Sequence, residues 1–540
     1  MKWRVKEVGL WIAMLVPCAL VALSDGEFSR LQQALRRPNV HTVKSDVTAA
    51  NGQRELLFQA TNGDEDLYAD KRASFNKGLV HQASGFPNVE AFLSLVRALQ
   101  GGSQEAFQAI QIGSGTKKLV NPQASFAFSL AANDAWINTA PPAPRFASAE
   151  TAGEMVELYW TVLVRDVPFN AFDSNGTVAA AVADLSNLSD FRGPKVGGAV
   201  TSATFLRGNT PGDLVGPYIS QFLYQPVDYG NTVMSATLFE TPVGTTVNDF
   251  LTTFDDWLTV QQGGLTNQSI TFDADNFIRT PRDLGEYVHQ DTPGQASLSA
   301  ALILQSLLGQ FGDTVLDPSN PYIGDRTQEG FVTFNISHVL ALMRNAVHEA
   351  LKAAWYHKWQ VNRRLRPEAY GFYVQQQVAQ GNFLGIHSDL TDSPVLPDIF
   401  SVYGSYFLPQ AYPEGSPVHP SYPAGHAAFI GAAVTILKAF FNEDFVIPNA
   451  LAPNLGNTAL VPFTEAPLTV GGELNKLAAN ISLGRDHAGV HYRSDGLQGM
   501  LLGEKVALDV LANGASLFHE PFAGFHLTTF GGESLLVGAP

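Results

Sequence analysis

The most informative segment of the sequence is Gly484-Arg-Asp-His-Ala-Gly-Val-His-Tyr-Arg-Ser-Asp495, which leads into a helix expected from residue 494 onward. His491 and Asp495 are four residues apart, a spacing at which two side chains can lie on one helical face. Asp495 can therefore orient the imidazole and leave one ring nitrogen free. Arg485 supplies a nearby cation. Taken alone, the segment is also compatible with ordinary surface ion pairs.

Toward the N-terminus, a second motif is His419-Pro-Ser-Tyr-Pro-Ala-Gly-His426, which is followed at once by an apolar helix predicted over Ala427 to Phe441. Gly425 lets the backbone approach a ligand closely, and a helix N-terminus offers free amides and a positive dipole end to an anion. We therefore expect His426 beside a bound anion. The alternative for this histidine is a structural role, as a cap or as a hydrogen-bonding group in the core.

A third motif is Lys358-Trp-Gln-Val-Asn-Arg-Arg-Leu-Arg366-Pro367. It lies at the end of a helix whose apolar stripe predicts that it runs to about Leu365, where Pro367 ends it. Eight residues correspond to about two helical turns, about 12 Å, with a phase difference of about 80°. The side chains of Lys358 and Arg366 can thus converge on one ion. Basic residues near a helix C-terminus also serve simply to offset the helix dipole.

Helical periodicity dominates the remainder of the chain and predicts an all-α protein. Further helices are expected at Ala152 to Val167, Leu474 to Ile481 and Ser494 to Ala512, whereas alternating strand patterns are scarce. Residues 25–330 mix helical stretches with Gly- and Pro-rich loops. We therefore expect an N-terminal helical region over residues 25–330 and a catalytic helical region over residues 331–540.

The chain is strongly acidic, so any site that binds an anion must depend on a local cluster of cations. The chain has 540 residues, of which 45% are hydrophobic, and 33 Lys and Arg against 50 Asp and Glu give a formal net charge of −17. This charge argues against nucleic acid or an anionic membrane surface as the main partner.

Residues 1–24 have the pattern of an export signal. Lys2, Arg4 and Lys6 precede an apolar run from Leu10 to Leu23. Export to the periplasm, the cell wall or the medium is the expectation, with a retained N-terminal anchor as the alternative. The only cysteine, Cys18, lies within this leader, so the mature chain could form no disulfide.

The three motifs occur in the order Lys-x7-Arg-Pro, Pro-x-Gly-His and Arg-x5-His-x3-Asp over about 140 residues. This order resembles the superfamily of vanadium haloperoxidases and type 2 phosphatidic acid phosphatases. The stretches Lys-Trp-Gln-Val, His-Pro-Ser-Tyr-Pro and Gly-Arg-Asp-His are most similar to the bromoperoxidases of marine algae and cyanobacteria. Two N-terminal landmarks also resemble that group, Gly153-Glu-Met-Val-Glu-Leu-Tyr-Trp160 and Arg165-Asp-Val-Pro-Phe169.

The resemblance implies a pair of four-helix bundles with long loops, assembled as a homo-oligomer that is a dimer or larger. It implies a vanadate cofactor whose oxygens are held by three cations and one backbone amide, those of Lys358, Arg366, Arg485 and Gly425. His491 would bind vanadium through a ring nitrogen, and His426 would be the acid-base histidine. One departure is Ala424, because family members mostly carry Ser at this position.

The implied activity is oxidation of bromide or iodide by hydrogen peroxide to a hypohalous-acid-type agent, which then halogenates an organic acceptor. We expect His419 to lie on the halide side, to hydrogen-bond His426 and to disfavour chloride, since chloride-oxidising members have an aromatic hydrocarbon side chain there. Trp355 could form an apolar wall beside the halide. The alternatives are an acid phosphatase, with His491 as nucleophile and His426 as general acid, and a catalytically silent anion-binding or assembly protein.

Overall fold

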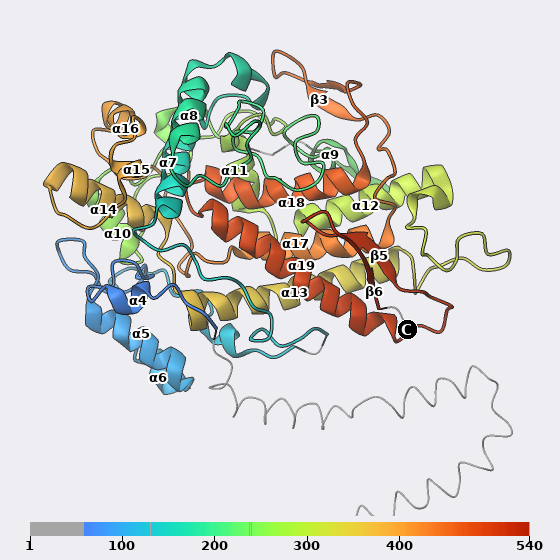
Figure 1. Ribbon diagram of the computed structural model, residues 1–540, viewed down its shortest axis with the longest axis horizontal. Coiled ribbons are helices and arrows are strands. Elements are labelled where there is room, and N and C mark those ends of the chain that lie inside the picture. Colours follow the sequence, from blue (N-terminus) through green and yellow to red (C-terminus); the bar gives the residue numbers. More distant parts are fainter. Residues whose placement is uncertain (1–58, 130, 237, 239, 539–540) are drawn as a thin grey trace, which may run out of the picture.

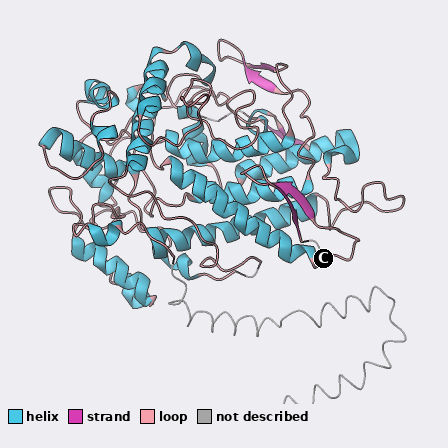
Figure 2. Cartoon of the chain, viewed as in Figure 1, coloured by secondary structure: helices cyan, strands magenta, loops and turns pink. Residues whose placement is uncertain are grey.

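The computed structural model describes residues 59–129, 131–236, 238 and 240–538 (Figure 1). The expected leader and Cys18 lie outside the described residues. Helices dominate the fold, which confirms the all-α prediction (Figure 2). The described strands form three small antiparallel pairs: β1 (Val227–Tyr229) with β2 (Thr232–Met234), β3 (Leu451–Pro453) with β4 (Leu460–Pro462), and β5 (Phe525–Thr528) with β6 (Ser534–Val537).

Four long helices form the centre of the molecule. They are α13 (Ile336–Tyr356), α17 (Gly425–Phe440), α18 (Val470–His487) and α19 (Arg493–Ala515), and α17 contacts each of the other three. In Figure 1 these helices run through the middle of the view. Helix α17 is buried along almost its whole length, as a helix that is apolar all round requires.

Glycines allow α17 and α19 to pack closely. A Cβ atom on Gly499 would lie 2.7 Å from the carbonyl oxygen of Ala424, and one on Gly503 would lie 2.1 Å from that of Ala428. Both distances are shorter than a real carbon–oxygen contact, so only glycine permits this approach. The N-terminus of α17 is thereby fixed against the first turns of α19.

Flanking helices cover this central group. Helices α11 (Pro281–Gln290) and α12 (Gln295–Phe311) contact α18, and α12 also contacts α13 and α17. A second layer contains α7 (Ala149–Val164), which packs against α8, α15, α16 and α18. The remaining helices of this layer are α8 (Gly176–Asn187), α14 (Pro367–Gln380), α15 (Ser388–Thr391) and α16 (Val395–Tyr403).

The other described helical segments lie around these layers. They are α4 (Asp64–Leu67), α5 (Val89–Gly101), α6 (Gln104–Gln108), η2 (Pro122–Phe126), η3 (Phe169–Ser174), α9 (Gln221–Tyr224), η4 (Thr246–Asn248), α10 (Phe254–Gln261) and η5 (Gly312–Val315). No described helix is both long enough and apolar enough to cross a membrane.

The prediction of one helix running to Leu365 was wrong. Helix α13 ends at Tyr356, a π-helical turn follows over His357–Asn362, and Arg363 adopts a left-handed conformation with φ of 38°. The Arg363 guanidinium is held there by Glu65 and by two carbonyl groups of the preceding turn. Pro367 begins α14 instead of ending a helix, because its fixed φ suits a first helical position.

Helix α18 is longer than expected. The prediction covered residues 474–481, whereas the helix continues to His487 and includes Arg485 and Asp486. These polar residues are buried, so an apolar pattern could not reveal them. Arg485 therefore belongs to the last turn of α18, and His491 lies in the short connection between α18 and α19.

The two largest hydrophobic cores each combine residues from both parts of the sequence. The first joins Leu284 and Ile303 to Ile430 and Leu477. The second joins residues of α7 to residues of α14 and α16, and includes Tyr492. The N-terminal helices therefore support the segment that carries the three motifs.

Candidate active site

The three motifs meet at one place, although each lies on a different element. Lys358 lies in the π-helical turn, Arg366 is the N-cap of α14, and Gly425 is the first residue of α17. Arg366 contacts both His491 and His419, and Lys358 contacts the carbonyl groups of the segment that precedes α17. The convergence predicted from one helix therefore arises across the π-helical turn and the left-handed Arg363 that separate α13 from α14.

His491 is buried and held by both ring nitrogens. Its Nδ1 lies 2.8 Å from Oδ2 of Asp495, and its Nε2 lies 2.8 Å from Nη1 of Arg366. Because a guanidinium only donates, Nε2 must be the acceptor and Nδ1–H must donate to Asp495. Burial lowers the pKa of His491 well below its usual value, and the charges of Arg366 and Lys358 lower it further. The ring is thus neutral and presents the Nε2 lone pair to the site.

Arg366 links the two histidines through one fully buried guanidinium. Its Nη1 donates to the Val490 carbonyl at 2.7 Å as well as to His491, and its Nη2 donates to Nδ1 of His419 at 3.0 Å. Its Nε donates to the His419 carbonyl at 3.0 Å. Burial lowers the pKa of Arg366 to about 9, so the group remains charged at neutral pH.

Lys358 is fully buried, and its ammonium group donates to the carbonyl oxygens of Pro420 at 2.8 Å and Ser421 at 2.7 Å. Burial lowers the pKa of Lys358 well below its usual value, and the Arg366 charge lowers it further. Two acceptors leave one of its three N–H donors for a ligand.

The charge balance of this cluster favours a bound anion. Within the described part of the chain, Lys358, Arg366 and Arg485 form no ion pair with a carboxylate, and the buried Nε of Arg485 has no hydrogen-bond partner. Buried charges are costly unless they are paired. A tetrahedral oxyanion such as vanadate would pair them, so the donor set fits the implied cofactor.

The N-terminus of α17 adds backbone donors to the cradle. Helix α17 has no side-chain cap, and among the described contacts the amides of Gly425, His426 and Ala427 have no acceptor. A Cβ atom on Gly425 would lie 3.1 Å from the Trp355 ring, so a larger residue here would require that ring to shift. Ala424 is fully buried, and its amide donates to the Asp495 carbonyl. Because alanine has no hydroxyl group, the side chain at this position cannot donate a hydrogen bond to an anion.

Asp495 is the centre of a buried polar network. Besides His491, its carboxylate accepts from Ser421 and from Arg364, the latter at 2.8 Å. Arg364 also forms an ion pair with Glu154 of α7 at 2.8 Å. The N-terminal landmark around Glu154 therefore anchors the carboxylate that orients His491.

His419 does not have the hydrogen bond that the sequence suggested. Its Nδ1 lies 3.0 Å from Nη2 of Arg366 and 3.1 Å from the Pro420 carbonyl oxygen, and no hydrogen bond to His426 occurs among the described contacts. Burial lowers the pKa of His419 well below its usual value, and the charges of Lys358 and Arg366 reinforce this effect. Its ring lies 5.0 Å from the partly exposed ring of Trp355. The expected hydrogen bond between His419 and His426 was therefore wrong. The His419 ring contacts Arg366 instead, and the His426 ring contacts Asp291.

His426 is oriented by Asp291, which follows α11. Its Nε2 lies 2.9 Å from Oδ1 of Asp291, and its side chain is 26% exposed, facing a cavity. Burial lowers the pKa of His426, the charge of Arg485 lowers it further, and Asp291 only partly opposes both. A neutral ring that donates Nε2–H to Asp291 keeps Nδ1 free to accept a proton.

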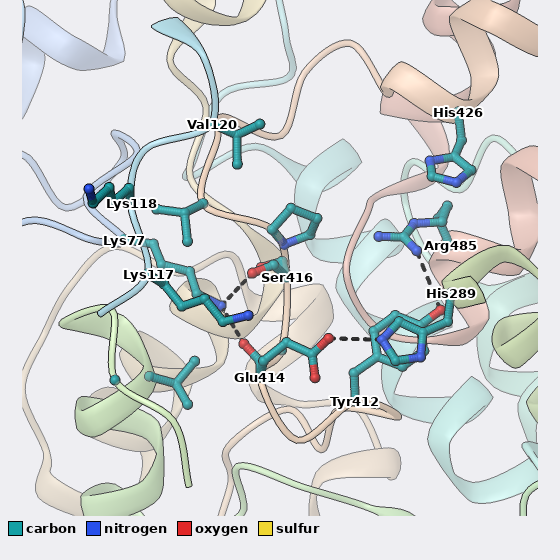
Figure 3. A pocket seen from close by; sticks show the side chains of 15 residues that line it. Lys77, Lys117, Lys118, Val120, His289, Tyr412, Glu414, Ser416, His426 and Arg485 are labelled. Carbon is teal, nitrogen blue, oxygen red and sulfur yellow. Dashed lines mark hydrogen bonds and ion pairs between the residues drawn. The ribbon is translucent and has the colours of Figure 1, made fainter. Parts of the chain in front are cut away.

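The cavity beside His426 has a volume of about 360 Å³ and is also lined by Arg485, Tyr412 and His289 (Figure 3). Arg485 donates to the Val288 carbonyl at 2.8 Å, and its guanidinium lies 5.4 Å from the Tyr412 ring centroid. The other face of Tyr412 stacks on His289 at 3.8 Å. These contacts place Arg485 and His426 at the inner end of an accessible cavity.

Several residues of the site were missed by the sequence analysis. Arg364 and Ser421 stand inside the quoted motifs, but nothing in their spacing distinguishes them from their neighbours. Asp291 lies 135 positions from His426, so only the tertiary structure brings the residue that follows α11 next to the first turn of α17. Glu286 and His289 have an i,i+3 spacing that could have indicated a paired site on α11.

Comparisons with known proteins agree with this geometry. A family model described as the VCPO second helical-bundle domain matches residues 338–520. The vanadium-dependent bromoperoxidase of Ascophyllum nodosum is 33% identical over 519 residues, covering 91% of this chain and 90% of that protein. The vanadium-dependent bromoperoxidase of Corallina officinalis is 31% identical, covering 90% of this chain and 94% of that protein.

A solved structure shows the same fold over almost the whole chain. The homohexameric second vanadate-dependent bromoperoxidase (AnII) of Ascophyllum nodosum superposes with a TM-score of 0.83 at 27% sequence identity, covering 93% of this chain and 94% of that one. The motif residues, the fold and the similarity over nine-tenths of the sequence thus agree, and the chain belongs to the vanadium-dependent bromoperoxidase family.

Proposed function

We propose that this chain is a vanadate-dependent haloperoxidase that oxidises bromide with hydrogen peroxide. The observation that carries the proposal is the group of three buried cations without a carboxylate partner among the described residues, gathered around His491, whose Nε2 accepts from one of them, Arg366. The overall reaction is Br⁻ + H₂O₂ + H⁺ → HOBr + H₂O, in which bromide loses two electrons and peroxide gains them. The reaction therefore needs an anion site and a source of protons.

Vanadate would be held by the three buried cations, the first amide of α17 and His491. Lys358, Arg366 and Arg485 would donate to its oxygens together with the Gly425 amide, and Nε2 of His491 would bind the metal. The neutral tautomer enforced by Asp495 is the form that a metal requires. Bound vanadate supplies a high-valent Lewis-acidic centre that activates peroxide without changing its own oxidation state.

The protein's own groups position substrates and move protons. His426 can take a proton at Nδ1 and return it, because its lowered pKa keeps the ring neutral at pH 7. Lys358 belongs to the π-helical turn after α13 and has one N–H that is not used by the carbonyl groups of Pro420 and Ser421. It can donate this N–H to a ligand oxygen that gains negative charge. Lys358 is fully buried, whereas His426 faces the cavity and can exchange its proton there.

The test is reconstitution of vanadate-free protein. We expect no bromination of a cyclic 1,3-dione without vanadate and full activity at about one vanadate per chain. Bromination that does not depend on vanadate would contradict the proposal. Hydrolysis of phosphate esters without peroxide would instead support the acid phosphatase alternative, which uses the same anion cradle.

Iodide should serve as well as bromide, and chloride poorly, with an organic acceptor receiving the halogen. The polar contact between His419 and Arg366 supports this halide order, because it offsets part of the cationic field that chloride oxidation needs.

Assembly and export form the last part of the proposal. A homo-oligomer is supported by the homohexameric relative, and export by the basic and apolar pattern of residues 1–24. Light scattering on purified protein would measure the first. N-terminal sequencing of protein recovered outside the cytoplasm would test the second, since an intact residue 1 would contradict cleavage.

A further inference from the structure

The cavity that leads to His426 is larger than bromide or peroxide requires. Its volume is about 360 Å³, whereas an apolar cavity of about 150 Å³ already accommodates benzene. Cavities of about 300 to 1,000 Å³ are typical of sites for organic ligands. The cavity can therefore hold one substituted ring directly beside the inner site.

The walls of the cavity combine apolar and cationic groups. Val120, Val260, Pro417 and Val418 supply apolar surface. In Figure 3, Lys117 extends toward Glu414 from one side, while Arg485 and His289 lie on the other. The neighbouring Lys118 also lines the cavity, but its side chain points away from the centre of the view (Figure 3).

The charges in the cavity do not cancel. Lys77 is buried and paired with Glu368 at 2.7 Å, and His289 is paired with Glu286 and Glu414. In the part of the chain that the structure describes, three lining cations, Lys117, Lys118 and Arg485, have no carboxylate partner, and they outnumber the one negative charge that the two glutamates leave beside His289. A local excess of positive charge in a chain of net charge −17 attracts anions to this cavity.

We propose that this cavity binds the organic acceptor and that it favours small aromatic acids, with the ring on the valine and proline wall and the carboxylate near Lys117. The proposal rests on the proposed function, because the bound ring is the acceptor for the oxidised bromine. The transfer is ArH + HOBr → ArBr + H₂O, in which the ring carbon gains bromine and loses its proton. Binding beside His426 places the ring where HOBr is released.

The first test measures binding without turnover. Benzoate is titrated into vanadate-loaded protein without peroxide, and its dissociation constant is measured by ligand-observed NMR. Loading with vanadate keeps benzoate away from the inner cations. Benzyl alcohol, which has the same ring without the charge, should bind at least about threefold more weakly.

Charge reversal at two adjacent lysines provides the matched comparison. Lys117→Glu should weaken benzoate binding at least about fivefold, while Lys118→Glu changes it less than about twofold. Both side chains are exposed, so neither variant should affect folding. Equal effects of the two variants, or no binding of benzoate to the wild type, would overturn the proposal.

The second test distinguishes this proposal from the proposed function. A mixture of 4-hydroxybenzoate and 4-hydroxybenzamide is brominated by the enzyme and, separately, by added hypobromite. We expect the enzyme to favour the acid more than hypobromite does, and Lys117→Glu to remove that preference while bromination of the amide continues. Identical product ratios would show that HOBr reacts only in solution, whereas loss of all bromination would contradict the proposed function instead.

Discussion

His491 donates its Nδ1–H to Oδ2 of Asp495 over 2.8 Å. The carboxylate is itself fixed by Arg364, by Ser421 and by its own place in the first turn of α19. The imidazole therefore has one orientation and one tautomer, with Nε2 directed at the cationic cluster. Such a partner of a metal-binding histidine strengthens the ligand as well as aiming it.

Asp495→Asn should lower vanadate affinity about 10- to 100-fold, because the amide no longer accepts a charge-assisted hydrogen bond from His491. Equilibrium dialysis with vanadium analysis measures the dissociation constant. Ser421→Ala is the matched control, since it removes another contact to the same carboxylate and should change the affinity by less than about fivefold. An unchanged affinity in Asp495→Asn would contradict this role.

His491→Ala should abolish both bromination and vanadium retention, because this side chain supplies the only protein bond to the metal in the proposed site. The fold should remain, since Asp495 keeps its ion pair with Arg364. Thermal unfolding followed by circular dichroism checks the fold. Bromination near the wild-type rate in a folded variant would refute the assignment of this ligand.

Orthophosphate should compete with vanadate during reconstitution, because both are tetrahedral oxyanions suited to the same cations and helix-end amides. Protein preincubated with millimolar phosphate should regain activity more slowly, and more vanadate should overcome the delay. Reconstitution rates that are independent of phosphate would place vanadate elsewhere.

His419→Phe should raise the chloride specificity constant relative to bromide. Phenylalanine cannot accept the hydrogen bond from Nη2 of Arg366, so that donor becomes available to the bound oxyanion and withdraws more electron density. Both constants are compared at matched peroxide and mildly acidic pH. Comparable constants for the two halides in the wild type would refute the proposed preference, and an unchanged ratio in the variant would exclude His419 as its cause.

His289 should make stability depend on pH on the alkaline side. Burial alone would lower the pKa of His289, but its contacts with Glu286 and Glu414 outweigh burial and raise the pKa to about 9. Because the pKa of His289 is higher in the folded protein, its charged form stabilises the fold fully at pH values below its unfolded pKa of about 6.5. This stabilisation is lost as the pH rises through about 9. The stability difference between wild type and His289→Gln should therefore shrink by about 2 kcal/mol over this interval.

Urea unfolding of both proteins at several pH values between 6 and 9.5 provides the measurement. A difference that stays constant over this range would mean that His289 is not charged in the folded protein.

Much of the site could be predicted from the sequence because its chemistry depends on residue type and short spacing. The contact between His491 and Asp495 was predicted from their separation of four residues, although His491 lies just before α19 and not on its face. Gly425 and His426 follow from their place at the start of an apolar helix. Helical periodicity likewise identified α17 and α19, whose apolar faces are long and regular.

The tertiary structure alone decided which distant groups meet. Asp291 reaches His426 across 135 residues, and Arg366 binds His419 and His491 beyond the π-helical turn that ends α13. Arg363, which follows that turn in a left-handed conformation, is bound by the distant Glu65. Local pattern carries no information about such contacts, since the free energy that selects them comes from packing between segments far apart in sequence.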